Sequence, residues 1–154
     1  SKIFPKIKIC LLESIGKKTE FLNHVVSSMG LKDVKIIYSR AENVAHDSNF
    51  REQFDVVLSR AVAKLSILSE ITIPFTKPGG DCIFFKGNNP DNEILEAEKA
   101  ISILGGEINN VFLKSEDMKL SFRGSLINVR KIGSTPVKYP RKSRNLKKNP
   151  LGHK

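Results

Sequence analysis

The stretch FDVVLSRA, residues 54–61, is the most informative part of this chain for its fold. The consecutive apolar residues Val56, Val57 and Leu58 predict a strand over 54–59 that is buried on both faces. A helix is expected to begin at Ser59 and Arg60, directly after that strand. Ligands of open parallel sheets bind beyond the carboxyl ends of the strands, so Arg60 is a candidate site residue.

Two earlier strands end in the same way. The segment IKICLLE, residues 7–13, ends at Glu13, and the strand over 34–38 is followed by Arg40-Ala41-Glu42. Parallel strands bring their carboxyl ends to one edge, so these polar residues are expected to line a single crevice with Arg60.

Short strands alternate with helical patterns, which favours βαβ units and a mostly parallel sheet. The expected strands are 7–13, 34–38, 54–59, 81–86, 106–114 and 122–131, with the last two pairing antiparallel. The first expected helix runs from Lys17 to Met29, and its apolar face comprises Phe21, Leu22, Val25, Val26 and Met29. A second extends from Ala61 to Pro74. The third is capped by Asn89 and stopped by Gly105, with a buried stripe of Ile94, Leu95, Ala97, Ile101 and Leu104.

Charge is distributed unevenly over the 154 residues, whose net charge is +10. All 16 acidic residues lie at or before Asp117, whereas residues 119–154 contain 11 Lys or Arg and no acid. Such a localised basic segment is typical of a protein that binds a polyphosphate such as RNA, although a solvated tail that aids solubility is the simpler alternative. Apolar residues become sparse after Lys131, and we therefore expect a domain over 1–132 and an extended basic arm without a core of its own over 133–154.

Composition also excludes several classes of protein. No apolar run approaches the ~20 residues that a membrane span needs. Cys10 and Cys82 lie within apolar strand patterns and are expected to be buried, reduced thiols, which fits a cytoplasmic protein. His24, His46 and His153 show no metal-ligand spacing, so no metal site is expected.

The polar strand ends have both a functional and a structural interpretation. A carboxylate such as Glu13 can accept hydrogen bonds from both hydroxyls of a ribose, but Glu13 or Ser14 can equally cap the following helix. Ala41 is small enough for an adenine ring to lie against it, whereas Glu42 also suits a helix N-terminus. Arg60 can bind a carboxylate or a phosphate, or form a structural ion pair with Glu13 or Glu42.

Several segments together resemble the small-subunit (16S) ribosomal RNA methyltransferase G family, also called glucose-inhibited division protein B. They are LLESIGKKTEFL (11–22), SRAE (39–42), FDVVLSRAVA (54–63), KPGG (77–80), FFKG (84–87) and the basic ending KYPRKSRNLKKNPL (138–151). The resemblance covers nearly the whole chain, and the serine-arginine-alanine after the strand and the proline-bearing tail are its most specific parts.

The resemblance implies an α/β fold of the class I methyltransferase (Rossmann-like) type, with S-adenosyl-L-methionine as cofactor. It implies methyl transfer to N7 of a guanine in 16S ribosomal RNA, in the cytoplasm, by a monomer that acts on that RNA or on the small ribosomal subunit. By position, the cofactor-binding residues are Glu13, Ser14, Ile15, Ala41, Glu42 and Arg60. The RNA-binding residues are expected to be Lys86, Arg123, Arg141, Lys142, Arg144, Lys147 and Lys148. The family's first central strand and glycine-rich loop are expected to be missing from this chain, because SKIFPKIKICLLES (1–14) resembles the end of the helix that follows that loop running into the next strand.

No catalytic acid or base is expected, because guanine N7 carries an in-plane lone pair and loses no proton before attack. Orientation alone can supply ~7–11 kcal/mol of a barrier. Two alternatives remain open: a nucleotide-binding oxidoreductase in which Glu13 binds the ribose of NAD, and a non-catalytic RNA-binding remnant of such an enzyme.

Overall fold

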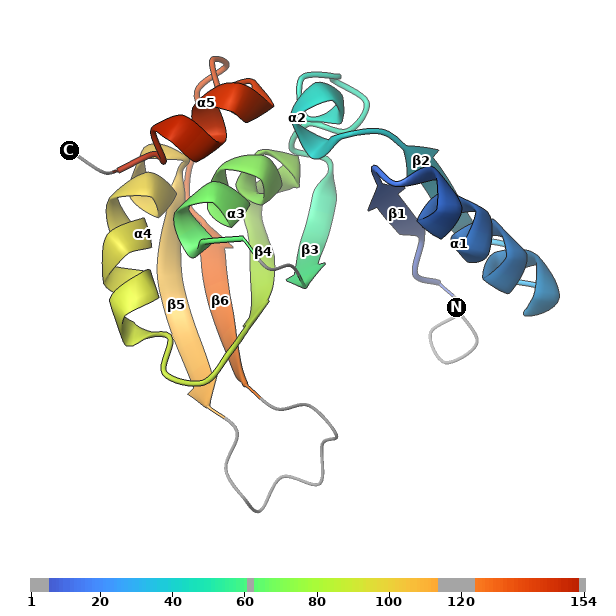
Figure 1. Cartoon of the computed structure of the whole chain (residues 1–154), viewed down its shortest axis with the longest axis horizontal. Coiled ribbons are helices and arrows are strands. Elements are labelled where there is room, and N and C mark those ends of the chain that lie inside the picture. Colours follow the sequence, from blue (N-terminus) through green and yellow to red (C-terminus); the bar gives the residue numbers. More distant parts are fainter. Residues whose placement is uncertain (1–5, 61–62, 114–123, 153–154) are drawn as a thin grey trace. The chain divides into compact units, whose positions relative to one another are not determined.

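The computed structural model of the chain describes residues 6–60, 63–113 and 124–152. The chain forms two compact units, Ser1–Val44 and Ala45–Lys154 (Figure 1). Within the described ranges, no helix has the length and apolar character required to cross a bilayer.

The first unit is a parallel strand pair with two helices. Strand β1 (Ile9–Glu13) pairs in parallel with β2 (Val34–Tyr38), and helix α1 (Gly16–Ser28) connects them. Helix α2 (Ala41–Val44) follows β2. Gly30 ends the α1 turn with a φ of 60°, a conformation that glycine adopts without strain.

The predicted apolar face of α1 is only partly buried. Leu22, Val25 and Val26 are half-buried, whereas Phe21 and Met29 have exposed fractions of 65% and 48%. The prediction that Phe21 and Met29 face a core is therefore wrong for this unit, because no described element of the unit is placed over them.

The second unit contains a four-stranded mixed sheet. Its strands are β3 (Phe54–Arg60), β4 (Thr76–Lys86), β5 (Gly106–Leu113) and β6 (Ser125–Lys131), in the spatial order β3-β4-β6-β5. The β3–β4 pair is parallel, and the other two pairs are antiparallel, which confirms the predicted final pair. The helices are α3 (Leu65–Thr72), the 3-10 turn η1 (Ile73–Phe75), α4 (Asp91–Ile103) and α5 (Ser143–Lys148).

The core of this unit lies between one face of the sheet and the helices α3 and α4, which Figure 1 shows on the same side of the sheet. The inward-facing side chains of β4 and β6 are Cys82, Phe84, Ile127 and Val129, and all four are fully buried. They pack against Leu65 and Leu68 of α3 and against Ala97 and Ile101 of α4. Burial of apolar surface at ~25 cal/mol per Å² is the main source of stability for this layer.

Strand β3 differs from its prediction. It continues to Arg60, α3 begins only at Leu65, and Ala61 and Val62 lie outside the described residues. Val56 and Leu58 have exposed fractions of 51% and 63%, so β3 is not buried on both faces. The apolar run identified a strand correctly but could not show what covers each face. Both β1 and β3 are edge strands of their sheets, and the expectation of a missing central strand stays a prediction.

Two details of α4 also correct the sequence analysis. Its N-cap residue is Pro90, and Asn89 precedes it with a φ of 56° and does not cap the helix. Leu95 is 70% exposed, while Ala97, Ile101 and Leu104 are buried as predicted and Ile94 is half-buried. Gly105 ends the helix with a φ of 82°, as expected.

The C-terminal segment is not simply extended. Residues 143–148 form α5, and Tyr139, Leu146 and Leu151 are buried, with Tyr139 and Leu151 belonging to the core cluster. The expectation of an extended arm is therefore wrong for the described part of the segment, because Tyr139 and Leu151 pack on the core of the unit, although Val137 is exposed. The boundary between residues 132 and 133 stays a prediction.

Candidate functional site

The first part of the candidate site is the carboxyl edge of β1 and β2. Glu13 and Tyr38 are paired in the strand register, and the backbone N–H of Ser39 donates to the carbonyl oxygen of Glu13 at 3.0 Å. The structure thus brings the Glu13–Ile15 segment and the Ser39–Glu42 segment to the same edge, as the sequence predicts.

The Glu13 carboxylate bonds to the turn that leads from β1 into α1. Its Oε1 accepts hydrogen bonds from the backbone N–H groups of Ser14 at 2.7 Å and Ile15 at 2.9 Å. Both N–H groups precede α1, and the helix has no side-chain cap, so Glu13 orders the turn between β1 and α1 and the capping role suggested for Glu13 or Ser14 is wrong. No described group bonds to Oε2, so this carboxylate can still accept a hydrogen bond from a ligand.

The turn after β2 is organised by Arg40 and Glu42. The carbonyl oxygen of Arg40 accepts from the N–H groups of Asn43 and Val44, which begins α2 at Ala41. The Glu42 side chain is only 11% exposed and lies 3.9 Å from the guanidinium of Arg40. Glu42 therefore stabilises this turn from within through Arg40, and Ala41, half-buried, is the first residue of α2.

Tyr38 is a candidate that the sequence analysis missed. Its side chain is 65% exposed at the end of β2, directly opposite Glu13, and a Cβ on Gly16 would lie 3.7 Å from its hydroxyl. An exposed aromatic ring at such an edge offers a stacking surface for a planar base. The available sequence signal was an aromatic residue immediately before the SRAE segment.

Arg60 belongs to the second unit, where it ends β3 opposite Phe85 in the strand register. It is exposed, and no acidic side chain among the described residues forms an ion pair with it. Glu13 and Glu42 belong to the first unit, so the alternative of a structural ion pair between Arg60 and either acid stays a prediction. An exposed, uncompensated guanidinium remains available for an anionic ligand.

Lys86, predicted to bind RNA, has internal partners. Its side chain is only 8% exposed, and its Nζ lies 2.6 Å from Oε1 of Glu93 and donates to the carbonyl oxygen of Ala63 at 2.8 Å. The same Glu93 oxygen accepts from the N–H of Leu65 at 2.7 Å. Lys86 and Glu93 therefore tie the chain that follows Arg60 to the start of α3 and α4.

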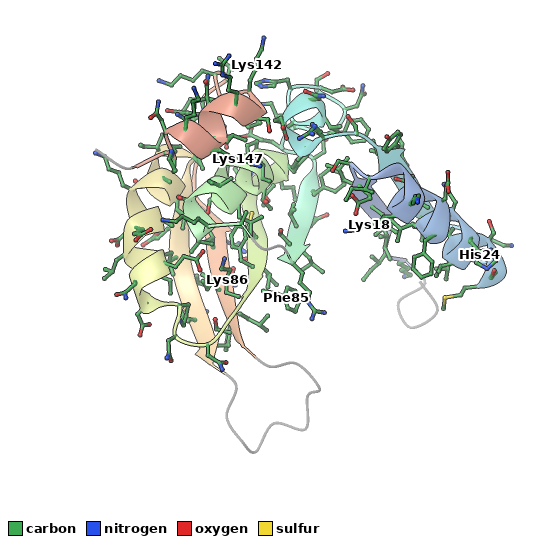
Figure 2. All side chains as sticks on the ribbon, viewed as in Figure 1. Lys18, His24, Phe85, Lys86, Lys142 and Lys147 are labelled. Carbon is green, nitrogen blue, oxygen red and sulfur yellow. The ribbon has the colours of Figure 1, made fainter. Side chains whose placement is uncertain are left out.

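The predicted basic residues of the C-terminus divide into two groups. Arg141 donates hydrogen bonds to the buried carboxylate of Glu70, and Arg123 lies outside the described residues. The remaining side chains are exposed, and none of them forms an ion pair with a described residue: Lys142, Arg144, Lys147 and Lys148. Figure 2 shows Lys142 and Lys147 at α5, away from Lys86 at the end of β4.

Arg60 and the C-terminal segment that carries the α5 cations lie at opposite ends of β3. Arg51 and Glu52 precede the first residue of β3 and contact the C-terminal segment at Tyr139 and Thr135, whereas Arg60 is the last residue of β3. A strand rises ~3.3 Å per residue, so Arg60 is about 20 Å from the first residue of β3. The structure therefore does not bring the cations of α5 to the strand edge that carries Arg60.

The thiols and possible metal ligands add no further chemistry. Burial raises the pKa of Cys82 to about 12, so Cys82 stays protonated at neutral pH, as expected of a buried thiol. Cys10 is half-buried, and burial also raises its pKa. Within residues 6–60, 63–113 and 124–152, no group of three His, Cys, Asp or Glu side chains is placed to hold a metal ion.

Solved structures with a similar fold define the class of protein. The fibrillarin of Aeropyrum pernix, solved with natively bound S-adenosyl-L-methionine, matches with a TM-score of 0.63 at 17% identity, over 82% of this chain and 57% of that chain. An rRNA methylase from Streptococcus thermophilus matches with a TM-score of 0.57 at 13% identity, over 82% of this chain and 74% of that chain. The chain therefore has the α/β fold of the class I methyltransferases.

Sequence comparison identifies the family. Residues 1–121 match the sequence model of GidB, rRNA small subunit methyltransferase G, and the chain belongs to this family. It is 46% identical to the ribosomal RNA small subunit methyltransferase G of Clostridium kluyveri over 149 residues, which are 97% of this chain and 62% of the relative. The corresponding protein of Geobacillus thermodenitrificans is 38% identical over 151 residues, covering 96% of this chain and 62% of the relative. The chain thus spans about three fifths of the length of the curated relatives that it matches.

Proposed function

We propose that this protein takes part in S-adenosylmethionine-dependent methyl transfer to N7 of a guanine in 16S ribosomal RNA. Membership of the rRNA small subunit methyltransferase G family supports the reaction class and an rRNA substrate. The observation that carries the proposal is the shared edge at which Glu13, Tyr38 and the turn after β2 meet.

The groups at this edge suit an adenosine. A carboxylate can accept hydrogen bonds from ribose hydroxyls, and Oε2 of Glu13 is free for this role while Oε1 accepts from the N–H groups of Ser14 and Ile15 before α1. The Tyr38 ring and the small Ala41 offer flat surfaces for adenine. Ser14 and Ile15 contribute backbone rather than side-chain chemistry, and Arg60 is available for a carboxylate or a phosphate.

The cofactor, when bound, supplies a methyl group on a positively charged sulfur. The protein's part is to bind and orient, because N7 of guanine is already nucleophilic and has no proton to lose. Holding the two reacting atoms in line can lower a barrier by ~7–11 kcal/mol. This is why the proposal needs no catalytic acid or base.

The partner in this proposal is 16S ribosomal RNA, free or in the small ribosomal subunit, and the protein acts on it as a monomer in the cytoplasm. The exposed cations of residues 142–148 are the proposed contacts to RNA phosphates. Lys86 and Arg141 have protein partners and are proposed to act on RNA only through the segments that they hold.

The test uses the intact protein with radiolabelled S-adenosylmethionine and 16S RNA from cells that lack this methyl group. The expected product is N7-methylguanine at a single position, and calorimetry is expected to show cofactor binding. In Glu13→Gln, affinity for the cofactor is expected to fall about tenfold, since hydrogen bonds to a charged group contribute ~1.5–3 kcal/mol. Glu20→Gln, which removes an exposed acid from α1, is the matched control.

Each alternative has its own outcome in this test. Binding of NADH without methyl transfer would favour the oxidoreductase. RNA binding without any heat on addition of S-adenosylmethionine would favour a non-catalytic remnant. Equal losses of cofactor affinity in Glu13→Gln and Glu20→Gln would show that Glu13 does not bind the cofactor.

A further inference from the structure

The C-terminal basic segment is held to the second unit by three polar anchors. The first is Glu52, whose Oε1 accepts from the N–H of Thr135 at 2.7 Å and from Nζ of Lys131 at 3.1 Å. Lys131 is fully buried and also bonds to the hydroxyl of Thr135, which donates to the carbonyl oxygen of Leu104 at 2.7 Å. This anchor fixes the chain directly after β6.

The second anchor is the guanidinium of Arg51. Its Nη1 donates to the carbonyl oxygens of Tyr139 at 2.8 Å and Ala45 at 3.0 Å. Its Nη2 donates to those of Thr135 at 2.8 Å and Pro136 at 3.2 Å. One side chain therefore satisfies several backbone acceptors of the C-terminal segment, where an irregular chain has no strand or helix partner for them.

The third anchor is the ion pair of Glu70 and Arg141. The Glu70 side chain is completely buried, and its Oε1 accepts from the backbone N–H of Arg141 at 2.8 Å and from Nε at 2.9 Å. Its Oε2 accepts from Nη2 at 2.7 Å. A bidentate pair of this kind fixes direction as well as distance. It stands immediately before the exposed cations of α5.

After the third anchor, the segment buries its leucines and exposes its cationic side chains. Leu146 and Leu151 are buried, while Lys142, Arg144, Lys147 and Lys148 are exposed around them. Figure 1 shows α5 near the top of the second unit, whereas the arrowhead of β3, at which Arg60 lies, points downward. The cations are thus held toward the end of the second unit at which β3 begins, away from Arg60 at the other end of the strand.

We propose that residues 138–148 form a prefolded binding surface for the RNA phosphate backbone, and that Glu70 is the positioning residue that holds it in place. RNA as the partner rests on the proposed function, but the prefolded state and the role of Glu70 do not. RNA helices are recognised largely through shape and backbone contacts. This surface, remote from Arg60, contacts a part of the RNA other than the target nucleotide.

The test compares two variants that remove one acid each. Glu70→Gln breaks the third anchor, and Glu98→Gln removes an exposed acid of α4 that no anchor uses. Both raise the net charge by one, which by itself strengthens binding to RNA. The proposal predicts the opposite change for Glu70→Gln, an RNA affinity about tenfold lower, because the loosened segment no longer holds all of its cations against the phosphates. Glu98→Gln is expected to bind as tightly as the unaltered protein or slightly more tightly.

The measurement is fluorescence anisotropy with a labelled transcript of small-subunit ribosomal RNA at several salt concentrations. Four phosphate contacts correspond to a slope of log affinity against log salt of about −3. The slope is expected to be shallower in Glu70→Gln, which a purely structural role in a folded variant would not produce. Arg141→Lys keeps the charge but loses the bidentate geometry, and it is expected to be weakened in the same direction.

Hydrogen exchange of the unaltered protein without RNA tests directly whether the segment is prefolded, and it needs no variant. The amides of Asn145, Leu146 and Asn149, which donate to backbone carbonyl oxygens in this segment, are expected to be protected without RNA, and they decide the matter if Glu70→Gln fails to fold. Unprotected amides, unchanged or stronger RNA binding by a folded Glu70→Gln, or no RNA binding by the unaltered protein would overturn the proposal. Cofactor binding and methyl transfer are measured separately, so each proposal can fail alone.

Discussion

Breaking the buried ion pair of Lys131 and Glu52 is expected to have strongly unequal effects from its two sides. Lys131 has a side chain with no solvent exposure, whereas the side chain of Glu52 is 22% exposed. In Glu52→Gln the ammonium group stays buried without a counter-ion, and in Lys131→Met the remaining carboxylate still accepts from the N–H of Thr135 and reaches water. The asymmetry in burial thus predicts an asymmetry in stability.

The magnitudes follow from the cost of an uncompensated buried charge. Removing one partner of a buried pair costs about 3–5 kcal/mol, and the partial exposure of Glu52 favours about 3 kcal/mol for Glu52→Gln. Lys131→Met replaces the buried charge by an apolar chain of similar length and is expected to cost about 1 kcal/mol. The double variant is expected to be more stable than Glu52→Gln alone, because the second change removes the uncompensated charge.

The assay is urea unfolding followed by far-ultraviolet circular dichroism, which suits a chain that contains no tryptophan. The free energies of unfolding of the two single variants and the double variant form a double-mutant cycle. A cost below about 1 kcal/mol for Glu52→Gln, or a double variant less stable than Glu52→Gln, would refute the reasoning, since either result means that Lys131 needs no counter-ion.

Three further predictions concern acid stability, Lys86 and Tyr38. Burial opposes ionisation of Glu52, but hydrogen bonds from Thr135 and Lys131 lower its pKa from 4.5. Its contribution to the free energy of unfolding is therefore present above pH 4.5 and is lost as the pH falls through the pKa of the folded state. Acid unfolding of Glu52→Gln should lack this pH-dependent loss of stability. Lys86→Met is expected to destabilise the fold by about 2 kcal/mol and to leave the salt slope of RNA binding unchanged, because the Nζ of Lys86 bonds to protein and not to solvent; a shallower slope would restore Lys86 as an RNA contact. Tyr38→Ala is expected to weaken cofactor binding by about 1–3 kcal/mol, whereas Tyr38→Phe is expected to bind the cofactor as well as the unaltered protein, because stacking needs the ring and not the hydroxyl. Calorimetry that shows the same loss of affinity in both variants would contradict a stacking role.

Much of the topology could be predicted because it depends on local patterns. The alternation of strands and helices, the antiparallel final pair and the positions of Gly30 and Gly105 all follow from periodicity and from backbone conformations that glycine favours. The meeting of Glu13 with the segment after β2 was also predictable, since parallel strands bring their carboxyl ends together.

Burial was predicted less well. The apolar run of β3 and the stripes of α1 and α4 indicated the elements correctly but misplaced Leu58, Phe21 and Leu95, which are exposed. A side chain's periodic position shows which face it occupies, but burial depends on the element that covers that face.

The amino-acid sequence by itself determined the order of the elements, the polar strand ends and the concentration of positive charge after Lys119, because each is a property of neighbouring residues. Only the tertiary structure decided which charges are free to bind a partner. In the sequence, Arg141 and Lys86 cannot be told from the other basic residues. In the fold, Arg141 forms an ion pair with Glu70, and Lys86 forms one with Glu93. Glu70 lies 71 residues from Arg141 in the chain, and Glu93 meets Lys86 only because the chain turns back into α4, so folding separates a structural cation from one that is available to RNA.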